Sequence, residues 1–162
     1  MHDGHGYFLE ELSVGMSESF TKQVSDQDIV GFANVSGDTN PVHLDGDFAR
    51  QTRFKERIAH GLLSASYISA VLGTRLPGPG CIYLSQNLKF RAPVRIGDTV
   101  TAKATITAID PEKGKIDLET VCTVGDKVVI DGQAQLLVSK RGAAGPVPDA
   151  QNDNGLGKAA SG

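Results

Sequence analysis

The sequence predicts an α+β protein in which an antiparallel sheet wraps around one long helix. Two observations carry this prediction. Residues 60–76 are mostly small or apolar, which is the composition of a helix with little polar surface and therefore of a buried one. Residues 81–139 are rich in β-branched residues and are divided by short turn signals, as in successive strands. A length of 162 residues suits one domain with a real core.

The elements before the long helix are short. Residues 1–15 contain three glycines and are expected to form a loose lead-in, and residues 16–24 alternate well enough for a strand. Ser25 and Asp28 then form a capping-box pattern, a hydroxyl followed three residues later by a carboxylate, which predicts the start of a helix. Gly37 is expected to end that helix.

Four strands are expected after the break at residues 77–80, and their spacing favours an antiparallel meander. They cover residues 81–93, 99–109, 115–124 and 127–139. From residue 142 onward Gly, Ala, Pro, Asn and Asp dominate, so we expect a folded domain over residues 1–141 and a disordered tail over residues 142–162.

The overall composition excludes several classes of protein. Charged residues make up 22% of the chain and the net charge is -3, so nothing indicates a nucleic-acid-binding surface. There is no apolar stretch of about 18 residues, so no membrane span is expected. Residues 1–7 lack the pattern of a secretory signal. Cys81 and Cys122 form no CxxC pair, and two reduced thiols in a cytoplasmic protein are the expected state.

The most informative segment is residues 38–43, which we expect to be a loop. It places Asp38, Asn40 and His43 within six residues, and Pro41 prevents a helix from continuing through it. An Asp and a His held side by side can share a proton and act on one water molecule. In the alternative interpretation, Asp38 only caps a turn and His43 is a surface residue.

A second informative segment begins the long helix. The first N–H groups of a helix have no internal partner, so the N–H of Gly61 is free to bind an oxygen that gains negative charge. Glycine at this position also lets a substrate come close. In the alternative interpretation, Gly61 is only a glycine that allows close packing. The water-activating pair and this N–H together indicate an enzyme acting on a substrate with an activated carbonyl.

Four stretches together carry a family resemblance. They are the D-x-N-P-x-H pattern of residues 38–43, AHGLLSAS of residues 59–66, IYLSQNLKFRAPV of residues 82–94 and GDTV of residues 97–100. The combination resembles the MaoC-like, (R)-specific enoyl-CoA hydratases, over roughly residues 12–140. The length is most similar to the short single-domain enzymes of that family that feed polyhydroxyalkanoate synthesis.

The resemblance implies a hot dog fold and a homodimer with each active site near the subunit interface. It also implies the reversible syn addition of water to trans-2-enoyl-CoA, giving (R)-3-hydroxyacyl-CoA in fatty acid metabolism. Coenzyme A is part of the substrate, so no cofactor is expected, and no metal site is proposed. The partners expected are therefore the acyl-CoA and a second copy of the chain, with neither nucleic acid nor membrane.

The resemblance gives roles to individual residues. Asp38 and His43 hold the catalytic water between them, and the N–H of Gly61 forms the oxyanion hole. Asn40 orients the pair or shapes the loop, two roles that the sequence leaves open. The hydroxyl of Ser66 helps to hold the pair or the substrate, or it bonds to the backbone of its own helix.

Further residues are candidates for substrate binding with weaker support. His60 positions the start of the helix or lines the pocket. Basic residues after the long helix are candidates for the coenzyme A phosphates, and apolar ones for the acyl pocket. The full set is His60, Leu62, Leu63, Tyr83, Leu84, Lys89, Arg91 and Arg95.

Two other functions remain open from the sequence. A thioesterase of the same fold would polarise the same carbonyl but would direct water to C1 and release coenzyme A. A non-catalytic acyl-CoA-binding subunit would share the fold without turnover. The presence of both Asp38 and His43 favours the hydratase over each of them.

Overall fold

A computed structural model describes residues 4–142 of the chain. The strands are β1 (Ser17–Gln23), β2 (Ile82–Phe90), β3 (Thr99–Asp110), β4 (Lys115–Val124) and β5 (Lys127–Leu137). The helices are η1 (Leu9–Glu11), α1 (Asp26–Ser36), α2 (Pro41–Leu44), α3 (Gly46–Gln51) and α4 (Gly61–Thr74). Within the described residues the strands form one antiparallel sheet, in the order β1-β3-β4-β5-β2.

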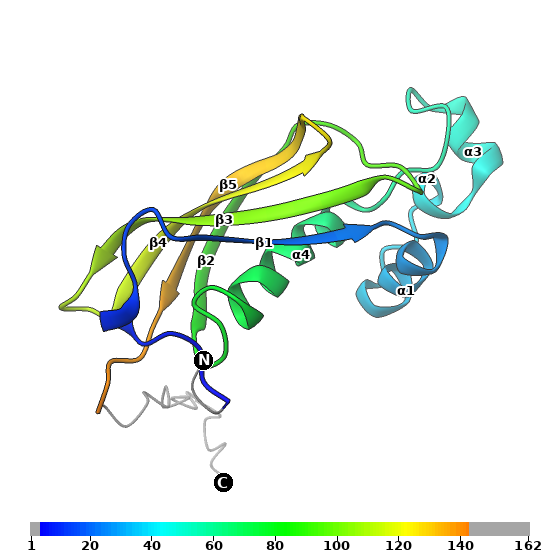
Figure 1. The fold of residues 1–162 in the computed structure, drawn as a ribbon. Helices are drawn as coiled ribbons and strands as arrows, with labels where there is room; N and C mark the ends of the chain where they lie inside the picture. Colours follow the sequence, from blue (N-terminus) through cyan, green and yellow to red (C-terminus); the bar gives the residue numbers. More distant parts are fainter. Residues whose placement is uncertain (1–3, 143–162) are drawn as a thin grey trace, which may run out of the picture.

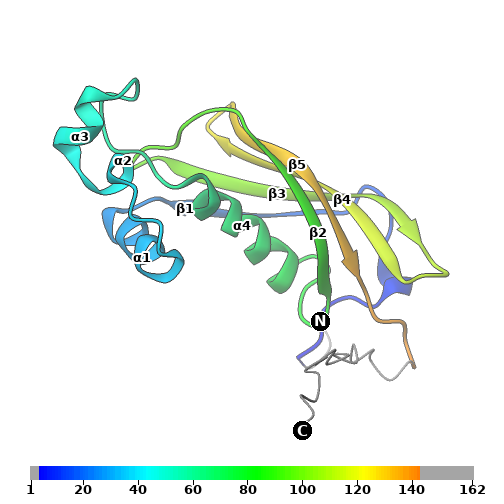
Figure 2. The same cartoon turned by 180° about the vertical axis from the view of Figure 1, so that it is seen from behind.

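Helix α4 lies against one face of this sheet, and α1, α2 and α3 gather at one end of it, beside the start of α4 (Figures 1 and 2). Strand β3 alternates between exposed and buried positions, and its buried side chains belong to the same core as those of α4. The α+β fold with a sheet packed on a long central helix is therefore confirmed.

The long helix is less enclosed than its composition predicts. One side of α4 is buried in the core, but Leu62, Ser66 and Ser69 on the other side are exposed in this chain. The expectation that α4 is buried on most sides is wrong for the single chain, because the sheet covers only one side of the helix (Figure 2).

The strand order also differs from a simple meander. Only β3, β4 and β5 follow one another across the sheet, whereas β2 pairs with β5 at the far edge. The backbones of β2 and β5 come very close at Gly132. A Cβ atom at this position would lie 2.0 Å from the carbonyl oxygen of Asn87, so a side chain at residue 132 would force the two strands apart.

Two expectations for the first half of the chain are corrected. The lead-in is not loose, because Leu9 and Leu12 are buried in the core and the N–H of Gly6 donates to the carbonyl of Pro79. Residues 38–43 are not entirely a loop, because α2 begins at Pro41 and contains His43. Proline fits the first position of a helix, where its missing N–H would have no partner.

The predicted helix ends are confirmed. Ser25 and Asp28 form the capping box of α1, and Gly37 ends that helix with a positive φ of 77°. His60 is the N-cap residue of α4. The predicted disordered tail lies, apart from residue 142, outside the described residues. Within residues 4–142 no helix is long and apolar enough to cross a membrane.

Candidate active site

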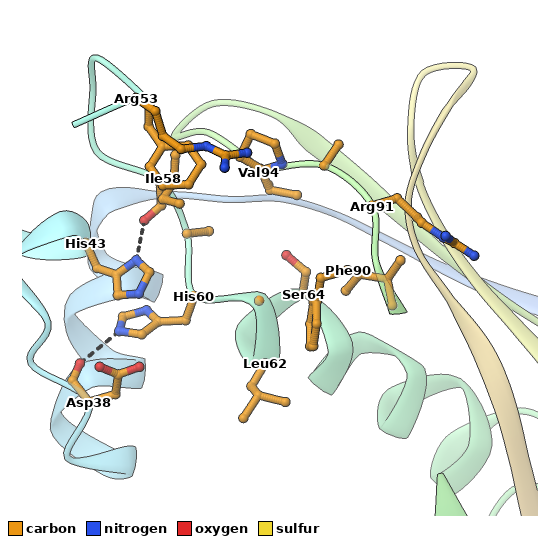
Figure 3. A pocket seen from close by; sticks show the side chains of 16 residues that line it. Asp38, His43, Arg53, Ile58, His60, Leu62, Ser64, Phe90, Arg91 and Val94 are labelled. Atoms are coloured by element: carbon orange, nitrogen blue, oxygen red, sulfur yellow. Dashed lines mark hydrogen bonds between the residues drawn. The ribbon is translucent and has the colours of Figure 1, made fainter. Parts of the chain in front are cut away.

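A cavity of about 450 Å³ lies at the N-terminal end of α4 (Figure 3). Side chains from the α1–α2 connection, from α4 and from the segment after β2 converge on it. The polar groups that line it are Asp38, His43, Arg53, His60, Ser64 and Arg91, and the apolar or small ones are Phe54, Ile58, Ala59, Gly61, Leu62, Phe90, Ala92, Pro93, Val94 and Ile130.

Asp38 is held at the cavity by the end of α1 and the start of α2. Gly37 turns the chain out of α1, and the N–H of Asp38 donates to the hydroxyl of Ser36 at 3.1 Å. Asn40 caps α2, because its side-chain oxygen accepts from the N–H of Val42 at 3.2 Å. Of the two roles left open for Asn40, the structure therefore supports the shaping of the loop. The carboxylate of Asp38 remains exposed.

His43 is buried, and one hydrogen bond fixes its tautomer. Its Nδ1 lies 2.8 Å from the carbonyl oxygen of Ile58, which can only accept, so Nδ1 carries a hydrogen. The Nε2 of the neutral ring then holds a lone pair. Burial lowers the pKa of His43 and the nearby His60 lowers it further, whereas the bond to Ile58 and the charge of Asp38 oppose this shift. The net lowering favours the neutral ring, which is the form that can accept a proton.

His60 supports both members of the pair. Its Nε2 donates to the backbone carbonyl of Asp38 at 2.9 Å, and its ring lies beside that of His43, with the centroids 3.9 Å apart (Figure 3). Its side chain is only 2% exposed. His60 stands at the start of α4 and lines the cavity, so both roles that the sequence left open fit its position, and it also contacts Asp38 and His43.

The spacing of these groups fits one bridging water. A carboxylate oxygen of Asp38 and one ring nitrogen of each histidine lie within 4.8 Å of one another. Two hydrogen bonds of about 2.8 Å that meet at a water span about 4.6 Å. In the alternative interpretation, the surface position of His43 is wrong because His43 is buried, whereas the carboxylate of Asp38 does cap a turn by accepting from the N–H of Asn40 at 3.2 Å.

The same three side chains are also a donor set that divalent cations use. However, Nδ1 of His43 and Nε2 of His60 already donate to backbone carbonyls. The two ring planes are only 31° from parallel, so their remaining lone pairs do not converge on one point. The three side chains fit an acid–base pair of Asp38 and His43, supported by His60 as a structural residue, better than they fit a cation site.

Gly61 begins α4 at the edge of this cavity. Among residues 4–142 no carbonyl accepts a hydrogen bond from its N–H, as expected for the first residue of a helix. A Cβ atom on Gly61 would lie 2.7 Å from the ring of Phe90. Glycine lets the Phe90 ring pack closely here, and a Cβ atom would push this half-exposed side chain aside.

Several predicted site residues lie outside the cavity. Ser66 is exposed, and its hydroxyl donates to the carbonyl of Leu63 within its own helix at 2.6 Å. Tyr83, Leu84 and Lys89 on β2 are exposed and do not line the cavity. Figure 3 shows none of them among the lining side chains.

The remaining predicted residues divide between the cavity and the protein surface. Leu62 and Arg91 line the cavity, and Arg91 forms an ion pair with Asp131 at 3.1 Å. Arg95 pairs with Glu56 outside it. Leu63 is a buried core residue.

Sequence reasoning gave no role to several lining residues, among them Ser64, Arg53 and Phe90. Ser64 is 1% exposed and lies one helical turn after Gly61. The spacing of three residues from Gly61 was a signal for it, since residues i and i+3 share a helix face. Arg53 comes from the segment after α3, for which the sequence carries no pattern.

The chain matches known proteins over most of its length. Residues 12–130 match the family model of the MaoC like domain. The chain is 57% identical to the (R)-specific enoyl-CoA hydratase of Rhodospirillum rubrum, over 84% of this chain and 94% of that protein. It is 52% identical to the 3-hydroxybutyryl-CoA dehydratase of Methylorubrum extorquens, over 86% of this chain and 89% of that protein.

Solved structures share the fold. The R-hydratase PhaJ1 of Pseudomonas aeruginosa, in its unliganded form, superposes with a TM-score of 0.79 at 42% identity, over 84% of this chain and 88% of that one. The (R)-hydratase of A. caviae involved in PHA biosynthesis gives a TM-score of 0.77 at 40% identity, over 80% and 98%. With this fold, this site and these matches, the chain belongs to the MaoC-like family of hydratases and dehydratases and has its hot dog fold.

Proposed function

We propose that the protein is an (R)-specific enoyl-CoA hydratase, which adds water reversibly to trans-2-enoyl-CoA and gives (R)-3-hydroxyacyl-CoA. The observation that carries this proposal is the convergence on one cavity of Asp38, His43 and the free N–H of Gly61. Relatives that are 57% and 52% identical are a hydratase and a dehydratase of such thioesters. Hydration and dehydration are the two directions of one reaction.

The pair activates a water for attack on C3. Nε2 of neutral His43 and the carboxylate of Asp38 both accept hydrogen bonds, so one water can donate to each of them. As its oxygen bonds to C3, the water gives a proton to the pair, and the pair returns a proton to C2 from the same side. This gives syn addition. The two coupled groups act as one acid–base unit.

The N-terminus of α4 stabilises the charge that this attack creates. Electron density moves to the thioester oxygen as the C3–O bond forms. The N–H of Gly61 and the positive end of the helix dipole both favour a negatively charged oxygen. The reaction consumes only water, so we propose that it needs no cofactor.

The carrier part of the substrate meets Arg53 and Arg91 at the edge of the cavity. Arg91 is already paired with Asp131, whereas the guanidinium of Arg53 lies 5.3 Å from the Phe54 ring centroid. Within residues 4–142 no carboxylate forms an ion pair with Arg53. Arg53 is therefore the better candidate for a phosphate of coenzyme A.

A homodimer fits the exposed surface around β2. Among the described strands, β2 is an edge that pairs only with β5. Tyr83, Leu84 and Phe90 on β2 and Leu62 on α4 are each between 41% and 59% exposed. An edge strand of nine residues that exposes these apolar side chains is a surface that a second copy can cover by strand pairing. In such a dimer Phe90 and the cavity would lie near the interface.

Two observations bear on the cellular setting. Cys81 and Cys122 are both free thiols, which fits a cytoplasmic protein. The A. caviae (R)-hydratase is involved in PHA biosynthesis. We propose that this chain likewise supplies (R)-3-hydroxyacyl-CoA for polyhydroxyalkanoate synthesis.

One assay separates the hydratase from its rivals. Purified protein is mixed with crotonyl-CoA while the enoyl absorbance and the free thiol are followed together. A hydratase removes the enoyl absorbance without releasing coenzyme A. Thiol release at the same rate as the absorbance loss would identify a thioesterase, and no change in either signal would indicate a non-catalytic subunit.

A further inference from the structure

Ser64 carries a buried hydroxyl group without a partner. Its side chain is 1% exposed, and no atom within the described residues forms a hydrogen bond with its Oγ. It lines the same cavity as Asp38, His43 and Gly61. Figure 3 shows the hydroxyl turned away from α4 into the space that the lining side chains surround.

Two other hydroxyls of α4 are satisfied within the helix, whereas the buried hydroxyl of Tyr67, which does not line this cavity, also lacks a partner among the described residues. The hydroxyl of Ser66 donates to the carbonyl of Leu63 and that of Thr74 to the carbonyl of Ala70, each at 2.6 Å. Such local bonds are the ordinary way in which Ser and Thr are satisfied in a helix. A buried hydroxyl with no partner is energetically unfavourable. A ligand in the cavity that accepts from Ser64 removes this cost.

The position of Ser64 in α4 indicates which ligand atom that is. Residues 61 and 64 are three apart and lie on the same helix face. Side chains in a helix lean toward its N-terminus, so the Ser64 hydroxyl leans toward the first turn, where the N–H of Gly61 is free. Two donors, one from the backbone and one from a side chain, are thus directed at the same end of the cavity.

We infer that Ser64 is a catalytic residue whose Oγ–H donates a second hydrogen bond to the thioester oxygen, beside the N–H of Gly61. This inference rests on the proposed hydratase function. A thioester oxygen has two lone pairs and can accept both bonds. The hydroxyl keeps its proton throughout, and its bond strengthens as negative charge collects on the oxygen.

The first test compares variants of Ser64 on crotonyl-CoA. In Ser64→Ala we expect kcat to fall about 10²-fold, as for loss of one oxyanion donor, with a much smaller change in KM. Ser64→Thr keeps the hydroxyl and should recover most of that loss. Thr74→Ala removes a hydroxyl from the far end of the same helix and should leave kcat unchanged, since that group is already bonded to Ala70.

The second test reads the polarisation of the carbonyl directly. A conjugated dienoyl-CoA absorbs at longer wavelength when its thioester oxygen accepts hydrogen bonds. It is bound to Asp38→Asn, in which turnover should be about 10²–10⁴-fold slower, and to Asp38→Asn/Ser64→Ala. We expect a smaller red shift in the double variant. A hydroxyl that only supports the fold would change the melting temperature and leave the red shift intact.

Each outcome has a distinct meaning. A wild-type enzyme that hydrates crotonyl-CoA, together with an unchanged kcat or red shift without the Ser64 hydroxyl, overturns the role of Ser64 alone. A wild-type protein without hydratase activity overturns the proposed function, and the role of Ser64 with it. If Ser64→Ala does not fold, Ser64→Cys, which has a similar size and a weaker donor, takes its place with the same expected direction.

Discussion

Two cavities of nearly equal size lie at opposite ends of α4. The one at the N-terminus measures about 450 Å³, and the one at the C-terminus, lined by Thr74, Arg75 and the lead-in segment, about 460 Å³. They differ in the state of their polar groups. The first holds two buried polar atoms without partners, Nδ1 of His60 and Oγ of Ser64.

Among the described residues, the second cavity is lined by none of the buried polar side-chain atoms that lack a partner. Arg75 donates to the carbonyl of Ser19, and Nδ1 of His5 is bonded to the carbonyl of Gly6 at 2.9 Å. Glu11 accepts from the N–H of Phe8 at 2.8 Å. The second cavity also lies at the negative end of the helix dipole, which disfavours a developing anion. Volume alone therefore does not identify a site, whereas unpartnered buried groups beside a free helix N-terminus do.

The largest expected effect comes from the acid–base pair. Asp38→Asn and His43→Ala should each lower crotonyl-CoA hydration about 10²–10⁴-fold, the range for loss of general acid–base catalysis. Steady-state kinetics measures this, with circular dichroism and gel filtration to verify folding and assembly. Glu18→Gln, an exposed change in the second cavity, is the control. Near-normal rates in either variant of the pair would remove it from the mechanism.

The next effect separates the two reasons for a glycine at residue 61. Gly61→Ala places a Cβ atom 2.7 Å from the Phe90 ring, and because this half-exposed ring can move aside, the protein should lose less than about 1 kcal/mol of stability, with lower activity. Gly61→Ala/Phe90→Ala should restore stability in urea unfolding. If the double variant also regains the activity of Phe90→Ala, glycine serves packing alone. Activity that stays low would show that the thioester needs the space as well.

The third effect is the pH dependence that follows from His43. Burial lowers its pKa below the ordinary 6.5, so the unfolded chain binds the proton more tightly than the folded one. Stability should therefore fall as pH drops below about 6.5, by at most about 1.4 kcal/mol per pH unit. Urea unfolding between about pH 7.5 and pH 5 measures this. His43→Gln should flatten this part of the curve, and an unchanged slope would contradict the assignment.

The smallest effect compares the arginines of the two cavities. Arg53→Ala should raise KM for crotonyl-CoA by up to about fivefold, the value of one exposed charge contact, with kcat little changed. Arg75→Ala should lower the melting temperature, since Arg75 bonds to Ser19 and lies over Phe20, without raising KM. Equal KM values for Arg53→Ala and the wild type would remove Arg53 from carrier binding.

Much of the fold could be predicted because its signals are local. The cap at Ser25, the turn at Gly37 and the start of α4 at His60 each depend on a few neighbouring residues. The pairing of β2 with β5 could not be predicted in the same way, because it depends on contacts between strands far apart in the chain. The alternation of side chains along a strand fits more than one neighbouring strand, so it does not identify the partner of β2.

The site residues also divide into those with a local sequence pattern and those that depend on packing. Asp38, His43 and Gly61 carry a pattern that marks them, and the structure brings them to one cavity. Ser64 and Ser66 look alike in sequence, and only the packing of α4 on the sheet decides which hydroxyl is buried and faces the cavity. The role of His60 likewise depends on its hydrogen bond to the carbonyl of Asp38, 22 residues away in the sequence.

The central claim is that water is added to one face of the double bond of an enoyl thioester in the cavity at the N-terminus of α4. The most direct measurement is hydration of crotonyl-CoA in D₂O, followed by chiral analysis of the product and by NMR at C2. The account predicts (R)-3-hydroxybutyryl-CoA with one deuterium at C2, placed by syn addition, and no free coenzyme A. An (S) or racemic product, or release of coenzyme A in step with loss of the enoyl group, would contradict it.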